Sequence, residues 1–426
     1  MQPVVWKNIG QLLTMSGDCC ATEDDALLGL LPSAAVVTLS DRIVWVGLEM
    51  DLPAEYQEGV SCRDLGGKVV MPGLVECHTH LVYAGNRAHE FVLRAKGATY
   101  REIGEAGGGI LYTVEATRRA SVPELLELAT HRLDRFLRWG VTTLEAKSGY
   151  GLDTDSECRI LEVARQLDGR HPVSLVSTFL GAHAVPREHK GCREAYVATV
   201  IDEMIPRVAS EGLAEFCDVF CEAGAFTVEE SRRILEAGLA RGLKPKIHAE
   251  QLTRQGGTAL AAELKAVSAD HLDLCVPEDA RALAVSGAVP VLLPGATFFV
   301  GHKTFPSGRM FRDAGCEVAL STDYNPGSSH TWNLWLMGTM ASVYMGMSPA
   351  ESLRGMTRSA AKAVGREERI GRISPGFQAD FVVLQALRWE EILYQFGDNP
   401  VWQVVKGGEV VSTAADCPSD PVLKRW

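Results

Sequence analysis

Short hydrophobic, β-rich runs alternate with helical segments between about residues 71 and 372. Eight of these runs have the length and the Val, Ile and Thr content of strands. They are GLVECHTH, VTTLEAK, VSLVSTFLGAH, EFCDVFCE, KPKIHAE, AVSADHL, VPVLLPG and EVALSTD. Eight β/α units over roughly 300 residues predict a (β/α)₈ TIM barrel.

The helical segment before VTTLEAK carries start and stop signals that can be checked. Ser121 and Glu124 have the spacing of a capping box, with Pro123 in the first turn. Gly140 is placed to end the helix. Its apolar residues fall mainly on one face, which we expect to pack on the barrel: Leu125, Leu128, Leu133, Phe136 and Leu137.

The two ends of the chain differ from the middle. Residues 1–70 read as short strands separated by polar turns, and residues 373–426 have the same character, with GFQADFVVLQ and VWQVVKGGEVV. Neither segment is large enough to fold alone with a core of its own. We therefore expect residues 1–70 and 373–426 to form one composite β-sandwich domain beside a catalytic barrel of residues 71–372.

Composition excludes some function classes. The 426 residues carry a net charge of −12 and no long basic cluster, which argues against nucleic acid or an anionic membrane as partner. Eleven cysteines, an odd number without a CxxC pair, are typical of reduced thiols. The start shows no signal pattern, and the apolar run near it is short and contains a proline. We expect a cytoplasmic protein that acts on a small molecule.

Candidate chemistry begins in MPGLVECHTHLVYAGNR, residues 71–87. His78 and His80 lie one residue apart at the end of the first predicted strand. Residues i and i+2 of a strand point to the same side, so both imidazoles face the barrel mouth. Active sites of such barrels lie at the carboxyl ends of the strands. Two neutral imidazoles there form half of a zinc-like site.

Candidates for the other half end other predicted strands. They are His183 in STFLGAH, His248 in KPKIHAE, His271 in AVSADHL and Asp323 in EVALSTD. A single histidine at a strand end is often a satisfied core or surface residue. Five of the eleven histidines at four strand ends favour a metal site instead.

These motifs resemble the amidohydrolase superfamily, which is marked by HxH on strand one, His on strands five and six, and Asp on strand eight. Within it, the chain resembles the imidazolonepropionase family. The stretches that carry this resemblance span the whole barrel: PGLVECHTHLVYAGNRAHEF, GATYREIGEAGGGI, EAKSGYGLD, GAHAVP, HAEQ, SADHL, LLPGATFF and STDYNPGSS. KSGYG, HAEQ and DYNPGSS are far more specific than HxH alone.

The resemblance implies a metal site and its ligands. The ligands carried over are His78, His80, His248 and Asp323. Relatives with two metals use a carboxylated lysine on strand four, where this chain reads EFCDVFCEAG without a lysine. We therefore expect one metal ion per subunit, with zinc and iron both compatible with imidazole and carboxylate ligands.

The implied reaction is hydrolysis of the cyclic amide bond of 4-imidazolone-5-propanoate to N-formimidoyl-L-glutamate, the third step of histidine degradation. Arg87 matches the arginine that holds the substrate, and its planar guanidinium suits a propionate. Tyr150 in KSGYG matches a tyrosine that contacts substrate. Tyr100 is a weaker candidate of the same kind.

Two residues are candidates for the general base, and two are candidates for stabilising the oxyanion. Glu250 follows His248 by two residues and is expected to face the same pocket, so either Glu250 or Asp323 is the general base. His183 or His271 is expected to stabilise the developing oxyanion. Further substrate contacts are expected from Gln251, Asn325, Gly327 and Ser328.

Two other readings compete with this one. The first is another cyclic amidohydrolase or a ring deaminase of the same superfamily, against which Arg87, Tyr150 and the NPGSS loop argue. The second is an inert metal-binding scaffold, against which the complete set of ligands argues. A homodimer is implied by the family resemblance alone.

Overall fold

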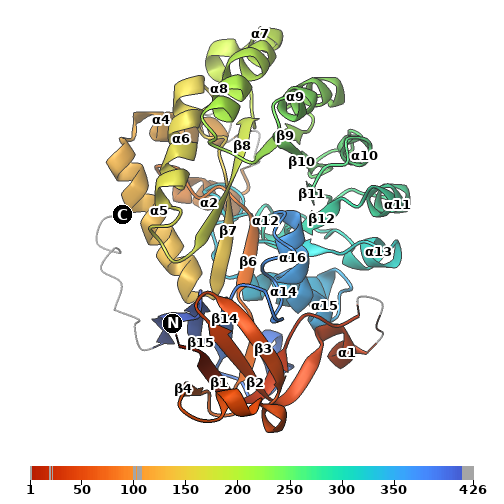
Figure 1. Cartoon of the computed structure of the whole chain (residues 1–426). Coiled ribbons are helices and arrows are strands. Elements are labelled where there is room, and N and C mark those ends of the chain that lie inside the picture. Colours follow the sequence, from red (N-terminus) through yellow and green to blue (C-terminus); the bar gives the residue numbers. More distant parts are fainter. Residues whose placement is uncertain (1, 19–20, 22, 99–101, 103–107, 415–426) are drawn as a thin grey trace.

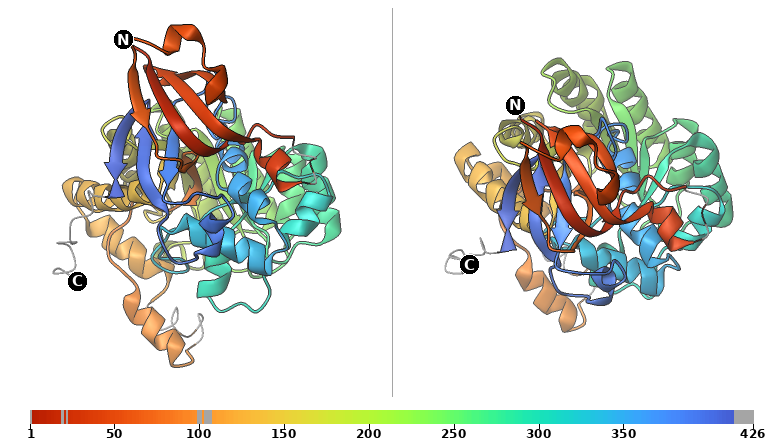
Figure 2. Two further views of the ribbon diagram at one scale, coloured as in Figure 1. Left: turned by 90° about the horizontal axis from the view of Figure 1, so that it is seen from below. Right: turned by 60° about the horizontal axis from the view of Figure 1, so that its bottom comes forward.

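The computed structural model describes residues 2–18, 21, 23–98, 102 and 108–414. Two sheets organise this part of the chain (Figure 1). One sheet is the parallel barrel, and the other is built from both chain ends. Figure 2 shows the second sheet, in red and dark blue, lying against one side of the barrel.

The barrel is a run of eight neighbouring parallel strands, in sequence order from β6 to β13, as predicted. Thr79 pairs with Tyr324, and the His80 N–H donates to the Tyr324 carbonyl at 2.9 Å, which brings the first and last strands together. The strands are β6 (Leu74–Thr79), β7 (Val141–Lys147), β8 (Ser174–Ala182), β9 (Phe216–Cys221), β10 (Lys244–Ala249), β11 (Ser268–His271), β12 (Val289–Leu292) and β13 (Ala319–Leu320).

Helices surround these strands (Figure 1). They are α2 (Ala88–Ala95), α4 (Ile110–Arg119), α5 (Val122–Arg138), α6 (Thr154–Leu167), α7 (Arg193–Thr199), α8 (Ile205–Ser210), α9 (Val228–Ala240), α10 (Gly257–Glu263), α11 (Pro277–Ser286), α12 (Pro294–Phe299), α13 (Gly308–Asp313), α14 (Leu334–Tyr344), α15 (Pro349–Gly355) and α16 (Arg358–Ala363). A 3₁₀ turn spans Arg187–His189, and a π-helical turn, Val200–Met204, joins α7 to α8.

Helix α5 shows how local sequence sets these elements. The Ser121 side chain accepts from the Glu124 N–H, and Pro123 lies in the first turn. Gly140 follows the helix with φ of 91°, a conformation that favours glycine. Leu125 and Phe136 are fully buried against the barrel, whereas Leu128, expected on the same face, is only half-buried.

The chain-end sheet has the order β16-β15-β14-β5-β1-β2-β3, with β4 paired to β1. Its members are β1 (Val4–Leu13), β2 (Leu30–Leu39), β3 (Arg42–Leu48), β4 (Ser61–Asp64), β5 (Val69–Pro72), β14 (Phe381–Leu384), β15 (Val401–Lys406) and β16 (Glu409–Thr413). Short helices α1 (Asp24–Leu28) and α17 (Glu391–Tyr394) and two 3₁₀ turns (Glu49–Asp51, Ala54–Tyr56) accompany it. Strands from the two ends meet directly, as expected, where β14 pairs antiparallel with β5.

A partly buried lysine ties this sheet to the barrel. The Lys406 ammonium donates to Asp380 Oδ2 at 2.7 Å and to the Thr142 carbonyl of β7 at 3.0 Å. Strand β5 also runs into β6 through Gly73, where a Cβ would lie 2.3 Å from the Thr142 hydroxyl. The junction therefore depends on close backbone approach. Among the described residues, no helix has the length and apolar character needed to span a bilayer.

The inner face of α5 is tested by two leucines of the same helix. Leu125→Ala should lower the free energy of unfolding by about 2–5 kcal/mol, since it leaves a cavity in a closed core. Leu128→Ala is the matched control and should cost clearly less, because Leu128 is half-buried. Urea unfolding followed by circular dichroism measures both. An equal loss in the two variants would contradict the assigned face.

Candidate active site

The carboxyl ends of four barrel strands bring the predicted polar residues into one buried cluster. His78 lies in β6, His80 directly follows it, and Asp323 follows β13. His248 lies in β10 and His271 ends β11. All five side chains are 0–3% exposed. Asp323 and His271 adopt positive φ values of 53° and 77°, and such backbone strain in residues other than glycine is typical of functional sites.

Three of these histidines are held by the same ring nitrogen. Nδ1 of His78 lies 2.6 Å from Asp270 Oδ2, and Nδ1 of His248 lies 3.1 Å from Asp218 Oδ1. Nδ1 of His80 donates to the Ser148 carbonyl at 3.3 Å. With Nδ1 as the donor, Nε2 of each ring keeps a free lone pair.

The Nε2 atoms and Asp323 converge. Asp323 Oδ1 lies 3.5 Å from Nε2 of His78 and 3.9 Å from Nε2 of His80. Ligand atoms of His78, His248 and His271 lie within 4.8 Å of one another, and so do those of His78, His80 and Asp323. Nε2 of His78 and of His248 are buried without a hydrogen-bond partner among the described residues. This donor set fits a transition-metal ion bound by imidazole and carboxylate.

Burial tunes the charge of these groups. It lowers the pKa values of His78 and His80 well below the ordinary range, and nearby cations and imidazoles add to the effect. Both rings are therefore neutral, the form that binds metal. Burial also raises the pKa of Asp323 to about 7. A bound cation opposes that shift, because it favours the carboxylate.

His183 and Tyr150 form a wall beside the cluster. The His183 ring stacks on His80 with centroids 4.9 Å apart, and its Nδ1 donates to the Gly149 carbonyl at 3.1 Å. Burial, and then His248, lower the pKa of His183 to about 3, so this ring is neutral. The buried Tyr150 ring lies 5.4 Å from that of His80.

A residue that the sequence analysis missed holds the Tyr150 loop. The buried Glu157 carboxylate accepts the N–H groups of Gly149, Gly151 and Leu152 at 2.7–2.9 Å. Leu152 has a positive φ of 55° within this turn. The one sequence signal for this role is an acidic residue in the first turn of α6, a common position for a cap.

Arg87 lies against Gly327, in the loop after β13, and is 5% exposed. Its Nη2 donates to Glu90 Oε2 at 2.7 Å, and the other oxygen of Glu90 accepts the Gly109 N–H at 2.8 Å. A Cβ at Gly327 would lie 2.1 Å from Nη1 of Arg87. The arginine is therefore fixed by Glu90 and by the backbone of the loop after β13. Glu90 is a second residue that the sequence analysis missed.

Glu250 lies directly after the end of β10, so the alternation of side chains along that strand does not reach it. With φ of 54° it has left the strand, and its carboxylate accepts the N–H groups of Gln255, Gly256 and Thr258 at 2.8–3.2 Å. It thus holds the start of α10, so the expected i, i+2 alignment with His248 does not apply. Gln251 is half-buried in the same turn.

The loop after β13 is organised by Asn325. Its Oδ1 accepts the N–H groups of Gly327 and Ser328, both at 2.8 Å, and its amide donates to the Asp323 carbonyl at 2.7 Å. The Ser328 hydroxyl donates to Asp323 Oδ2 at 3.3 Å. Asn325 therefore shapes the loop, while Ser328 orients the carboxylate of Asp323. Tyr100 lies outside the described residues.

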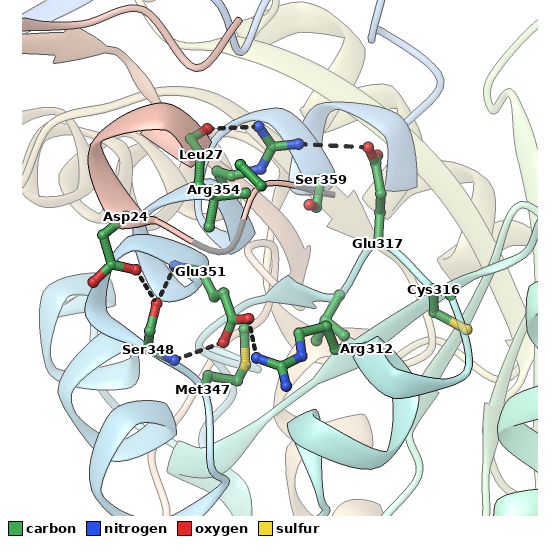
Figure 3. Close-up of a pocket in the computed structure, with 13 residues that line it drawn as sticks. Asp24, Leu27, Arg312, Cys316, Glu317, Met347, Ser348, Glu351, Arg354 and Ser359 are labelled. Atoms are coloured by element: carbon green, nitrogen blue, oxygen red, sulfur yellow. Dashed lines mark hydrogen bonds and ion pairs between the residues drawn. The ribbon is translucent and has the colours of Figure 1, made fainter. Parts of the chain in front are cut away.

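A pocket of about 540 Å³ lies elsewhere, between α1, α13 and α15 (Figure 3). It borders Cys316, Glu317 and Val318, at the amino end of β13. Two ion pairs cross it, Arg312 with Glu351 and Arg354 with Glu317. None of the predicted site residues that the structure describes lines this pocket, so it is not part of the cluster.

Fold and site together define the class of the molecule, a metal-dependent hydrolase of the amidohydrolase type. Residues 182–411 match the amidohydrolase family. The solved structure of guanine deaminase from E. coli is similar, with a TM-score of 0.71 and 14% identity over 97% of this chain and 99% of that one. At such identity the likeness supports the fold alone.

Relatives with assigned names identify the family within this class. An imidazolonepropionase of Geobacillus kaustophilus is 48% identical over 96% of this chain and 98% of its own length. One of Paracoccus denitrificans is 45% identical over 94% and 98%. The chain therefore belongs to the imidazolonepropionase family.

Removing one imidazole tests whether His248 helps to bind a metal ion. His248→Ala should weaken metal binding at least about tenfold, because a convergent nitrogen is removed. His131→Ala removes an exposed histidine of α5 and should keep the metal content of the unchanged chain. Mass spectrometry of metals in the purified proteins measures both. Full metal loading of the His248 variant would refute its place among the ligands.

Proposed function

We propose that this chain hydrolyses 4-imidazolone-5-propanoate to N-formimidoyl-L-glutamate, the third step of histidine degradation. Water adds to the ring carbonyl carbon, and the ring C–N amide bond breaks. The family relationship supports the reaction. The observation that carries it is the convergence of His78, His80 and Asp323, with a buried Arg87 against the loop that follows Asp323.

The proposed ligands of one metal ion are His78, His80, His248 and Asp323, the set that the family resemblance implies. Ligand atoms of His78, His80 and Asp323 lie within 4.8 Å of one another, and those of His248 lie within 4.8 Å of those of His78. Zinc and iron both suit these donors. A bound ion of this kind lowers the pKa of water to about 7 and polarises a carbonyl group. Strand β9 offers Asp218 and two cysteines instead of a lysine, which supports one ion per subunit.

Asp323 is the general base in this proposal. Its Oδ2 accepts the Ser328 hydroxyl, and Oδ1 faces the imidazole cluster. Oδ1 has two lone pairs, so it would bind the metal ion with one and take a proton from water with the other. The alternative base, Glu250, already accepts three backbone N–H groups at the start of α10. Its proposed role is therefore to position the turn that follows His248.

The remaining site residues bind substrate. Arg87 holds the propionate, and the loop of Asn325, Gly327 and Ser328 fixes the arginine and contacts the ligand. Tyr150 and Gln251 contact the ring. His183 and His271, both neutral, are placed to stabilise the negative charge that develops on the carbonyl oxygen. Tyr100 is proposed as one more contact on sequence grounds.

Three further properties belong to the proposal. The enzyme is cytoplasmic and forms a homodimer. Its catalytic barrel spans residues 71–372, beside a small domain of residues 1–70 and 373–426. Size-exclusion chromatography with light scattering tests the dimer.

A product assay tests the substrate. The purified enzyme with its metal should release N-formimidoyl-L-glutamate from imidazolonepropionate and should leave guanine and cytosine unchanged, because neither base carries a propionate for Arg87. Turnover of guanine or cytosine alone would favour a ring deaminase. A folded protein with neither metal nor turnover would favour the inert scaffold.

The role of Arg87 in substrate binding is tested by comparing the change in KM with the change in kcat when its side chain is removed. Arg87→Ala should raise KM about tenfold to a hundredfold, the equivalent of losing a charged hydrogen bond of about 1.5–3 kcal/mol. Gly327→Ala should raise KM in the same direction, because its methyl group displaces the guanidinium. Metal content should not change in either variant.

Arg94→Ala is the control for these variants. Arg94 lies on the same helix, α2, with its guanidinium over the Phe299 ring, and its loss should leave KM unchanged. An unchanged KM in Arg87→Ala would contradict the assigned role of Arg87.

A further inference from the structure

A cluster of charged side chains lies inside the barrel, next to the metal-site histidines. Five residues form it, and each is fully buried: Glu145 and Lys147 of β7, Asp218 of β9, Lys246 of β10 and Asp270 of β11. Buried charges are costly unless they are paired, so an arrangement of this kind calls for a physical reason.

One ammonium group joins two parts of the cluster. Nζ of Lys147 lies 2.7 Å from Asp218 Oδ2 and 3.4 Å from Asp270 Oδ2. It also donates to Glu145 Oε1 at 3.1 Å. Asp218 and Asp270 are the carboxylates that bond to Nδ1 of His248 and of His78. A single lysine thus contacts the supports of two proposed ligands.

Its surroundings favour the protonated, charged form of Lys147. Burial alone would lower the pKa of this ammonium, but Asp218, Glu145 and Asp270 raise it well above its ordinary value. The ammonium lies beside both carboxylates, and a carboxylate oxygen that accepts the proton of Nδ1 fixes the tautomer of the ring. Nε2 of each histidine then keeps its lone pair for a metal.

We propose that Lys147 is a positioning residue of the metal site. Its ammonium sets the orientation of His78 and His248 together, through Asp270 and Asp218. This inference rests on the proposed metal ligands and adds a residue that reaches them only through others. Neither the HxH motif nor the ligand set predicts it.

Lys246 offers a matched control. It is also fully buried inside the barrel, and its Nζ donates to Glu145 Oε2 at 2.8 Å. Within the described residues it bonds to neither Asp218 nor Asp270. Lys246→Met and Lys147→Met therefore remove the same group at similar depth, but only Lys147→Met removes the shared partner of the two aspartates.

The probe is Co²⁺, whose visible absorption reports the geometry of its ligands. Affinity is measured by competition with a chelator, and folding by circular dichroism. Lys147→Met should bind Co²⁺ about tenfold to a hundredfold more weakly, with a changed absorption spectrum. Lys246→Met should keep the affinity and the spectrum of the unchanged chain, even where its stability falls.

The outcomes separate this inference from the proposed function. Tight Co²⁺ binding by the unchanged chain together with an unaltered affinity and spectrum in Lys147→Met would overturn the role of Lys147 alone. Equal losses in the two lysine variants would also overturn it. Failure of the unchanged chain to bind Co²⁺ would overturn both the metal site and this inference.

A second measurement covers a Lys147 variant that does not fold. Asp218→Asn and Asp270→Asn, singly and combined, form a double-mutant cycle for Co²⁺ affinity. If both carboxylates act through one ammonium, the loss in the double variant should differ from the product of the single losses. Independent, multiplicative losses would contradict the coupling.

Discussion

Each histidine at the barrel mouth has two ring nitrogens, and the site depends on which of them the protein holds. Acceptors behind the rings hold Nδ1 of His78, His80 and His248. Nε2 of each ring is thereby left free. The strand ends place Nε2 of His78 and His80 near Asp323 Oδ1, and His248 lies with His78 and His271. Strand geometry alone would bring the rings together without choosing the nitrogen.

Buried carboxylates also shape the rim of the site. Glu157 holds the turn of Tyr150, Glu250 holds the start of α10, and Glu90 holds Arg87. Each accepts at least one backbone N–H group that would otherwise be buried without a partner. These bonds hold the loops around the histidine cluster in one arrangement, which favours catalysis because little reorganisation is needed during the reaction.

The fold was largely predictable, because its signals are local. All eight strand runs became strands. Ser121 caps α5 as expected, but among the described residues the Glu124 side chain does not bond back to the Ser121 N–H, so the predicted capping box is only half formed. The spacing of His78 and His80 likewise placed both side chains on one side of β6, since strand periodicity requires it.

The supporting residues could not be predicted in this way. The roles of Glu90 and Glu157 depend on turns whose backbone N–H groups converge only in three dimensions. Glu250 departs from the strand pattern because its positive φ rotates it out of register. Lys147 and Asp218 are 71 residues apart in the sequence and lie in different strands, and only the folded barrel brings Nζ and Oδ2 to 2.7 Å.

The most direct test of this account is a crystal structure of the protein with its metal, with anomalous scattering recorded at the metal absorption edge. The account predicts one anomalous peak per subunit, bound by Nε2 of three histidines and by the Asp323 carboxylate. A peak bound through Nδ1, or one located away from these four side chains, would contradict it.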